Sequence, residues 1–203
     1  MSGGDSHHYH DSSHPIPAPE LILEDGIILR FPIEGDAEEL FHKIDENRDY
    51  LREWLPWLDD VKSIDDEMDL IRDNWNKMDK SYFYLILFSG NIAGVISLNW
   101  IDWSNRSFGL GYWLSSDLTG LGIVTKSCHA LIQHCFIDLG LHRSVIEVGI
   151  GNHTSRAVAE RLGMRLEGIS KDREWLYDHF TDSAMYAITS KEWQIKNHGL
   201  SRP

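Results

Sequence analysis

The sequence contains little cysteine: Cys128 and Cys135, seven positions apart, are the only two among 203 residues. They lie in a stretch with helical spacing of apolar residues, where a rise of about 1.5 Å per residue separates their Cα atoms by about 10 Å. A disulfide requires Cα atoms within about 7 Å of each other. We therefore expect two free, buried thiols on one helix face, which fits a reduced cytoplasmic setting.

Long apolar runs and positive charge are also lacking. No run approaches the ~20 apolar residues that a membrane-spanning helix needs, and the N-terminus lacks the basic-then-apolar pattern of a signal peptide. Asp and Glu number 32 against 19 Lys and Arg, which gives a formal net charge of -13. Nucleic acids bind clustered Lys and Arg, so we expect neither nucleic acid nor a membrane as a partner. The acidic surface either attracts a cationic substrate, such as an amine or a basic peptide, or serves solubility alone.

Composition divides the chain into three parts. Residues 1–20 are rich in Gly, Ser, His, Asp and Pro and nearly free of apolar residues, which predicts a flexible tail. Residues 21–195 carry regular apolar patterns and predict one domain, and residues 196–203 predict a short C-terminal tail. The histidines show no metal-ligand spacing such as His-Glu-x-x-His, so no metal site is expected.

The apolar periodicity predicts a mixed α/β domain. Two of the predicted helices begin at residues that are typical of helix N-termini: Asp36 begins the first, and Ser63 caps the third. Three strand-like runs between residues 82 and 115 are separated by short turns and predict an antiparallel meander. Helices are expected over 36–44, 47–54, 64–78, 123–139 and 154–162, and strands over 26–31, 82–88, 92–100, 107–115, 144–150, 164–174 and 182–189.

A glycine-rich turn precedes the fourth predicted helix. It consists of Thr119, Gly120, Leu121, Gly122, Ile123, Val124 and Thr125. Glycine allows backbone N–H groups to converge on an anion without obstruction by Cβ, and the helix behind adds its positive end. The turn lacks the Gly-Lys-Ser/Thr of a Walker loop and the third glycine of the dinucleotide fingerprint. From spacing alone, an anion-binding loop and a purely structural turn are both open.

Four segments, in the right order, resemble the Gcn5-related N-acetyltransferases (GNAT), and in particular the RimJ/RimL branch, which acetylates protein N-termini. They are Tyr-Leu-Arg-Glu-Trp-Leu-Pro-Trp over 50–57, Gly-Tyr-Trp-Leu over 111–114, the turn over 119–125, and Asn-x-x-Ser with its helix, Gly-Met and Glu-Gly over 152–168. The resemblance covers residues 26–193. The chain departs from the family at Met164, where Phe is usual, at Thr119, where Gln or Arg is usual, and at Val124, where Gly or Ala is usual.

The resemblance implies an α+β GNAT fold, with a mostly antiparallel sheet of about seven strands flanked by helices. The sheet is expected to splay between the two strands that bracket the cofactor helix, with the pantetheine of acetyl-coenzyme A (acetyl-CoA) between them. The loop would hold the pyrophosphate, with Thr119 contributing its backbone N–H. The other residues that the resemblance assigns to the cofactor are Trp113, Leu114, Ser115, Asn152, Ser155 and Arg156. For Asn152, a turn or helix-cap role is equally open.

The resemblance also implies direct attack of an amine on the thioester in a ternary complex. Ser155 falls where RimL-type enzymes place a serine near the coenzyme A sulfur, and Glu174, nineteen residues later, falls where they place the base. Residues 153–162 contain no tyrosine, which many other family members use as the acid. Ser155 could instead bond locally within the first helical turn, and Glu174 could be a solvated charge. Trp54 and Trp57 either wall the acceptor pocket or pack onto the core.

The expected activity is acetyl transfer from acetyl-CoA, as co-substrate, to a primary amine. The resemblance favours a protein N-terminal α-amine, such as that of a ribosomal protein. A small amine (a polyamine, an amino acid or a drug) stays open because the fold serves all these substrates. A non-catalytic acyl-CoA sensor is the alternative from another class. A homodimer is an expectation from the family alone.

Overall fold

The computed structural model describes residues 14–76 and 80–198. Its sheet has eight strands in the order β1-β2-β3-β4-β5-β6-β8-β7. The strands are β1 (Glu20–Ile22), β2 (Ile27–Arg30), β3 (Tyr82–Phe88), β4 (Asn91–Asp102), β5 (Ser107–Leu114), β6 (Arg143–Gly149), β7 (Arg165–Leu176) and β8 (His179–Thr189). The helices are α1 (Ala37–Glu46), α2 (Arg48–Arg52), α3 (Ile64–Asn76), α4 (Ile123–Ile137), α5 (His153–Arg161) and α6 (Ser190–His198), with short 3-10 helices η1 (Glu34–Asp36), η2 (Pro56–Asp60) and η3 (Ser116–Leu118).

The predicted mixed α/β fold is confirmed, with two additions. Strand β1 makes the sheet eight-stranded rather than seven-stranded, and α6 follows the last predicted strand. Three residues are too few for a periodicity to be recognised, and α6 has no clear apolar stripe. The part of the third predicted helix beyond residue 76, including Met78, lies outside the described residues.

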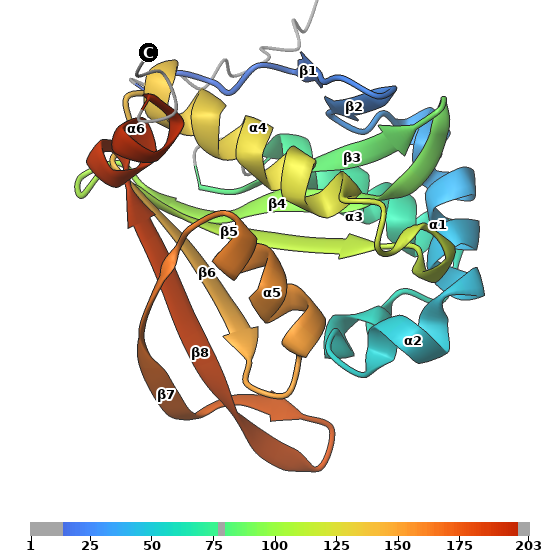
Figure 1. Cartoon of the computed structure of the whole chain (residues 1–203). Helices are drawn as coiled ribbons and strands as arrows, with labels where there is room; N and C mark the ends of the chain where they lie inside the picture. The colour runs from blue at the N-terminus through green and yellow to red at the C-terminus, as the bar shows by residue number, and fades with distance from the viewer. Residues whose placement is uncertain (1–13, 77–79, 199–203) are drawn as a thin grey trace, which may run out of the picture.

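One pair of neighbouring strands is parallel, and this pair separates along its length. Strands β5 and β6 pair from Ser107 with Arg143 to Leu110 with Ile146. Beyond that point β5 continues to Leu114 and β6 to Gly149 without pairing to each other. The splay that the resemblance implied is therefore present, and it opens beside the start of α4 (Figure 1).

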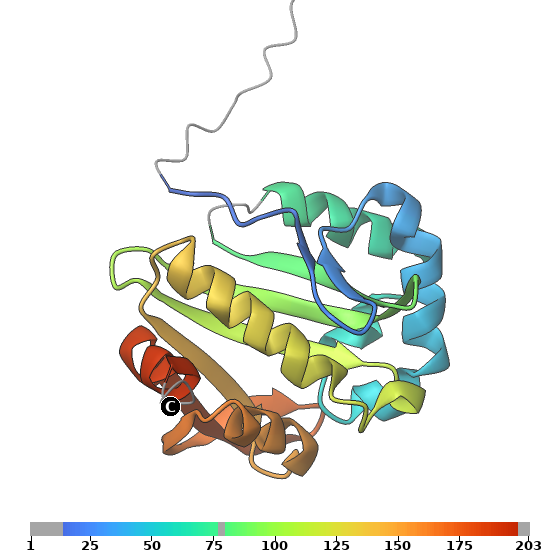
Figure 2. The same cartoon turned by 45° about the horizontal axis from the view of Figure 1, so that its top comes forward.

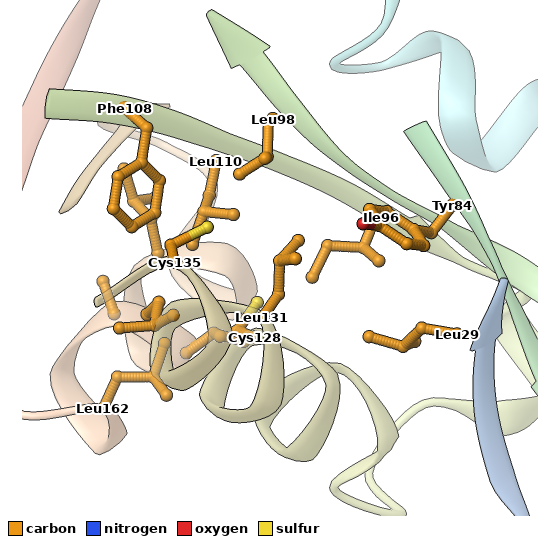
Figure 3. Packing of buried hydrophobic residues seen from close by; sticks show 14 of the residues in the cluster. Leu29, Tyr84, Ile96, Leu98, Phe108, Leu110, Cys128, Leu131, Cys135 and Leu162 are labelled. Carbon is orange, nitrogen blue, oxygen red and sulfur yellow. The ribbon is translucent and has the colours of Figure 1, made fainter. Parts of the chain in front are cut away.

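Two hydrophobic clusters cover opposite faces of the sheet. The larger joins the strands to α4, α5 and α6, which lie on one side (Figures 1 and 2). In Figure 3, Cys128, Leu131 and Cys135 of α4 point toward the sheet residues of this cluster. The smaller cluster joins α1 and α2 to the other face and includes Trp113. Both cysteines are free and buried, as predicted, and burial raises the pKa of each thiol.

The segment 14–20 contacts the domain, although the sequence analysis assigned it to a tail. The backbone N–H of Ala18 donates to Nε2 of His134 at 3.0 Å, and the Tyr84 hydroxyl donates to the carbonyl of Ala18 at 2.9 Å. The His14 ring stacks on Trp103 with centroids 4.7 Å apart. At the other end, α6 extends past the expected boundary at residue 195 to His198. Within the described ranges, no helix has the length and apolar content to cross a bilayer.

A buried carboxyl lies in α3 among these packed elements. Glu67 is 3% exposed, and its Oε2 has no hydrogen-bond partner among the described residues. Burial raises the pKa of Glu67 from 4.5 to about 7. The unfolded carboxyl therefore loses its proton at lower pH than the folded one. Stability is lost as pH rises from 4.5 to about 7 and levels off above.

We predict that Glu67→Gln raises the free energy of unfolding at pH 8 by up to about 3 kcal/mol, because each pKa unit is worth about 1.4 kcal/mol. Near pH 4.5 the gain should largely disappear, since the wild-type carboxyl is then mostly protonated in the folded state. Urea unfolding at the two pH values measures the difference, with Glu38→Gln on the exposed side of α1 as the control. A gain of the same size at both pH values would contradict the prediction.

Candidate active site

A large cavity lies where β5 and β6 separate. It has a volume of about 620 Å³. Its wall is formed by α2, the end of β5, the glycine turn before α4, and the start of α5. Segments far apart in the sequence therefore meet at one opening. It combines a strand edge with the N-terminus of a helix.

Of the three residues predicted to offer backbone groups at the end of β5, one turns these groups toward the opening. The N–H of Ser115 donates to the carbonyl of Ala93 in β4 at 2.8 Å. Because backbone groups alternate along an antiparallel pair, those of Trp113 also face β4, and those of Leu114 face the gap. Of the three residues predicted to offer backbone groups to a cofactor, Leu114 alone is oriented to do so. Trp113 borders the cavity, while Ser115 does not.

Ser115 instead belongs to a buried hydrogen-bond network that fixes the turn before the glycine loop. The side-chain amide of Asn47 donates to Oγ of Ser115 at 3.1 Å, and the N–H of Ser116 donates to Oδ1 of Asn47 at 2.9 Å. The Ser115 hydroxyl in turn donates to Asp117 at 2.5 Å. Asn47 is only 5% exposed. Its position between two helices was the only sign of its role, and the sequence analysis did not single it out.

The glycine turn presents unpaired backbone donors. Gly120 and Gly122 have backbone φ angles of 83° and 77°, which residues other than glycine rarely adopt. No atom lies within 4 Å of the position that a Cβ would take at either residue. The first helical bond of α4 runs from the N–H of Lys126 to the carbonyl of Gly122. The N–H groups from Gly120 to Thr125 donate to no other described residue. A helix N-terminus of this kind favours an anion.

Two of the predicted loop residues differ from expectation, although one of them, Thr119, borders the cavity. Thr119 was expected to offer its backbone N–H, but that group donates to the carbonyl of Ser116 at 3.4 Å, and its hydroxyl to the same oxygen at 2.8 Å. Leu121 is 57% exposed and does not border the cavity. Ile123, Val124 and Thr125 do border it. The available donors are therefore shifted by one residue toward the helix.

The start of α5 places a free hydroxyl on the opposite wall. Asn152 is the N-cap, and its Oδ1 accepts the N–H of Ser155 at 3.1 Å. The cap role is therefore real, and the amide nitrogen of Asn152 is left without a partner among the described residues. Oγ of Ser155 makes no hydrogen bond to another described residue, and Ser155 borders the cavity. Local bonding of the Ser155 hydroxyl, the alternative open from the sequence, does not occur.

Tyr112 links the two walls. Its hydroxyl donates to the carbonyl of Ser155 at 3.0 Å, and Tyr112 also borders the cavity. Burial raises the pKa of Tyr112 well above its ordinary value of 10, so the hydroxyl keeps its proton. The sequence analysis quoted this tyrosine within a motif but gave it no role.

Arg156 and Trp57, two residues predicted for the site, lie outside the cavity. Arg156 donates from Nε to the Tyr186 hydroxyl at 3.1 Å and from Nη1 to the carbonyl of Ile150 at 3.0 Å, which ties α5 to β8. Trp57 is 41% exposed. By contrast Trp54 borders the cavity, and a Cβ on Gly149 would lie 2.9 Å from its ring.

Glu174 does not share a cavity with Ser155. It borders a second recess of about 250 Å³, together with Asn99, Trp100, Glu147 and Arg173 among others. Glu147 alternates with the buried Ile146, which faces α4, so the recess lies on the opposite face of the sheet.

The recess is acidic around one ion pair. Nε of Arg173 lies 2.8 Å from Oε1 of Glu147. The pKa of Glu174 is raised by partial burial and by the negative charge of Glu147, while the charge of Arg173 opposes the shift. The residue as a whole stays exposed. A carboxylate with a raised pKa suits proton transfer, and no cluster of three metal-ligating side chains occurs among the described residues.

We predict that Asn47→Ala lowers the free energy of unfolding by about 2 kcal/mol, because it leaves buried partners unsatisfied. Ser115→Ala should cost less than Asn47→Ala. The double variant should lose less than the sum of the two, since both side chains belong to one network. Denaturant unfolding of the three variants measures the coupling. Strictly additive losses would show that Asn47 and Ser115 act independently.

Comparison with known proteins agrees with this geometry. Residues 27–165 match the model of the acetyltransferase (GNAT) domain family. The putative ribosomal N-acetyltransferase YdaF of Bacillus subtilis is 31% identical over 175 residues, which is 85% of this chain and 96% of that protein. The structure of RimL, a ribosomal L7/L12 alpha-N-protein acetyltransferase, in complex with coenzyme A superposes with a TM-score of 0.81 at 30% identity, over 84% of this chain and 97% of that one.

A further solved structure is that of the microcin C7 self-immunity acetyltransferase MccE in complex with acetyl-CoA and AMP. It superposes with a TM-score of 0.78 at 34% identity, over 82% of this chain and 93% of that one. The family match, these likenesses and the splayed strands beside a helix N-terminus agree. The chain belongs to the GNAT family and is an N-acetyltransferase.

Proposed function

We propose that this protein transfers the acetyl group of acetyl-CoA to the α-amine of a protein N-terminus, of the ribosomal-protein type, in the cytoplasm. The observation that carries the proposal is the opening between β5 and β6, where an unpaired strand edge meets the free N–H groups at the start of α4. RimL and YdaF, which are similar along nearly their whole length, carry names of ribosomal acetyltransferases.

Acetyl-CoA fits this opening in both charge and shape. Its pyrophosphate would accept hydrogen bonds from the N–H groups between Gly120 and Thr125. Its pantetheine is an extended chain with amide groups, which would pair with the backbone of Leu114 as a further strand does. The unpartnered amide nitrogen of Asn152 supplies a donor on the α5 side.

Ser155 is proposed to assist the departure of the thiol. The acceptor nitrogen attacks the thioester carbonyl carbon, the new C–N bond forms, and the C–S bond breaks to release a thiolate. The free Oγ of Ser155 would donate a hydrogen bond to that sulfur. Tyr112 and the Asn152 cap hold the first turn of α5, and so orient Ser155.

Glu174 is proposed as the base that removes the proton from the amine. Ser155 and Glu174 border separate cavities. The recess at Glu174 lies on the face of the sheet away from α4, and the larger cavity reaches that face at α2. The acceptor would therefore approach from the side of Glu174. The proton would pass through water, because Glu174 is not among the described residues that border the larger cavity. Glu147 and Glu174 together favour a positively charged amine at this entrance.

A small-molecule amine is the second candidate acceptor. The recess of about 250 Å³ is small, and the similar MccE structure contains AMP as well as acetyl-CoA. Either acceptor would present a free amine to the same carboxylates.

We further propose that a second copy of the chain packs on the outer strands, since Leu166, Ile169, Trp175 and Phe180 of β7 and β8 are exposed.

The test of the function is thiol release from acetyl-CoA with a panel of acceptors: peptides with ribosomal-protein N-termini, polyamines, amino acids and aminoacyl nucleotides. Release that depends on a peptide, with the peptide gaining the mass of one acetyl group, supports the proposal. Release with small amines alone would assign the second candidate. Tight binding of acetyl-CoA without release from any acceptor would favour a sensor.

We predict that Ser155→Ala lowers kcat by about 10- to 100-fold, since a hydrogen bond to a charged group is worth about 1.5–3 kcal/mol. The Kd for acetyl-CoA should change little, because the thiolate forms only in the reaction. Ser104→Ala is the control, because Ser104 is exposed in the turn between β4 and β5 and borders neither cavity. A Ser155→Ala enzyme with wild-type kcat would remove the hydroxyl from the mechanism.

Glu174→Gln should lower kcat strongly and leave the Kd for acetyl-CoA unchanged. In the wild type, the activity should rise with pH as Glu174 loses its proton, and this limb should lie above the ordinary range of a glutamate because the pKa is raised. The limb should be missing in Glu174→Gln. Asp172→Asn, two residues away, is the matched control and should keep it. Unchanged turnover, or an identical limb in Glu174→Gln, would exclude the base role.

A further inference from the structure

Two cations stand out on the wall of the larger cavity. Lys126 and Arg161 are the Lys and Arg side chains that border it among the described residues. Both lie at the α4 end, beside the unpaired N–H groups. We propose that Arg161 and Lys126 together recognise the ribose 3′-phosphate of coenzyme A and so make the enzyme selective for the 3′-phosphorylated cofactor. This inference deepens the proposed function and depends on it.

Arg161 is placed for the task by the end of α5. Its Nε donates to Oγ1 of Thr125, in the first turn of α4, at 3.4 Å. This contact directs the guanidinium toward the helix N-terminus and leaves its two terminal nitrogens without a partner among the described residues. A guanidinium with free terminal N–H groups matches the geometry of a phosphate and binds it bidentately.

Lys126 reaches the same region from α4. Its ammonium pairs with Asp25 in the turn between β1 and β2. Both side chains of the pair are about half exposed, at 48% and 62%. An exposed ion pair contributes little stability. The ammonium can therefore bind a dianionic phosphate at little expense to the fold.

The charges of the ligand and the protein favour separate binding groups for the pyrophosphate and for the 3′-phosphate. Coenzyme A carries a pyrophosphate and a separate 3′-phosphate. The backbone donors between Gly120 and Thr125 suit the pyrophosphate, but they carry only the partial charge of a helix end. The protein has a net charge of -13, which opposes a second anion. The two cations supply the local positive charge that the 3′-phosphate requires.

The experiment compares acetyl-CoA with acetyl-dephospho-CoA, which lacks the 3′-phosphate, by calorimetric titration. The proteins are the wild type, Arg161→Gln, Lys126→Gln, the double variant, and Lys191→Gln. Lys191 is an exposed lysine of α6 outside the cavity. Circular dichroism and thermal melting check that each variant is folded.

We expect the wild type to bind acetyl-CoA at least about tenfold more tightly than the dephospho form, since charged hydrogen bonds to phosphate have this magnitude. Each single variant should reduce the ratio, and the double variant should bind both ligands within about twofold of each other. The Kd for acetyl-dephospho-CoA should stay unchanged throughout, and Lys191→Gln should keep the wild-type ratio.

Three outcomes would overturn the inference. If the double variant keeps the wild-type ratio of the Kd values for acetyl-dephospho-CoA and acetyl-CoA, these cations do not bind the 3′-phosphate, while the proposed function stands. If both ligands weaken equally, the cations act on the pyrophosphate instead. If the folded wild type binds neither ligand, the proposed function itself fails together with this inference.

Discussion

The separation of β5 from β6 is the constraint on which the rest of the structure depends. Their pairing stops at Leu110 and Ile146, yet β5 continues to Leu114 and β6 to Gly149. Strand-edge N–H and C=O groups inside a domain are costly unless another group pairs with them. The opening therefore demands a partner with backbone-like donors and acceptors. The amide chain of pantetheine has that chemistry.

The elements around the opening each depend on its two walls being held in place. On the β5 side, Asn47 fixes Ser115 and Ser116, which set the direction of the chain into the glycine turn. On the β6 side, Asn152 caps α5, and Tyr112 reaches across to the carbonyl of Ser155. The α4 side of the opening carries neutral donors and two cations, while the recess at Glu174 on the other face is acidic. This division suits a polyanionic acetyl donor on one face and a cationic amine on the other.

The sequence predicted the parts of this arrangement that local chemistry determines. The spacing of apolar residues predicted α4, and the two glycines before it predicted a turn at the N-terminus of that helix. The position of Ser155 at the start of a helix followed from a motif of four residues, and a cap was one of the two roles left open for Asn152. Strand β1 was missed because three residues carry no periodicity, and segment 14–20 was assigned to a tail because its contacts with Tyr84 and His134 are long-range.

The remaining misses also concern long-range contacts. Arg156 was placed at the cofactor because it follows Ser155, but its side chain turns to Tyr186 and Ile150. Arg161, which does border the cavity, was passed over because nothing local shows that the end of α5 meets the start of α4. The role of Glu174 stays a prediction. The spacing that suggested it does not show on which face of the sheet the side chain lies, because a bulge between Ser170 and Glu174 shifts the register.

The most direct test of the central claim is a titration of acetyl-CoA followed by the backbone amide NMR signals of the protein. We predict a saturable one-to-one change, concentrated in the amides of Gly120, Gly122 and Leu114 and in the first turn of α5. Signals that stay unchanged at these positions, or that move only elsewhere in the described chain, would contradict the claim that acetyl-CoA binds between β5 and β6.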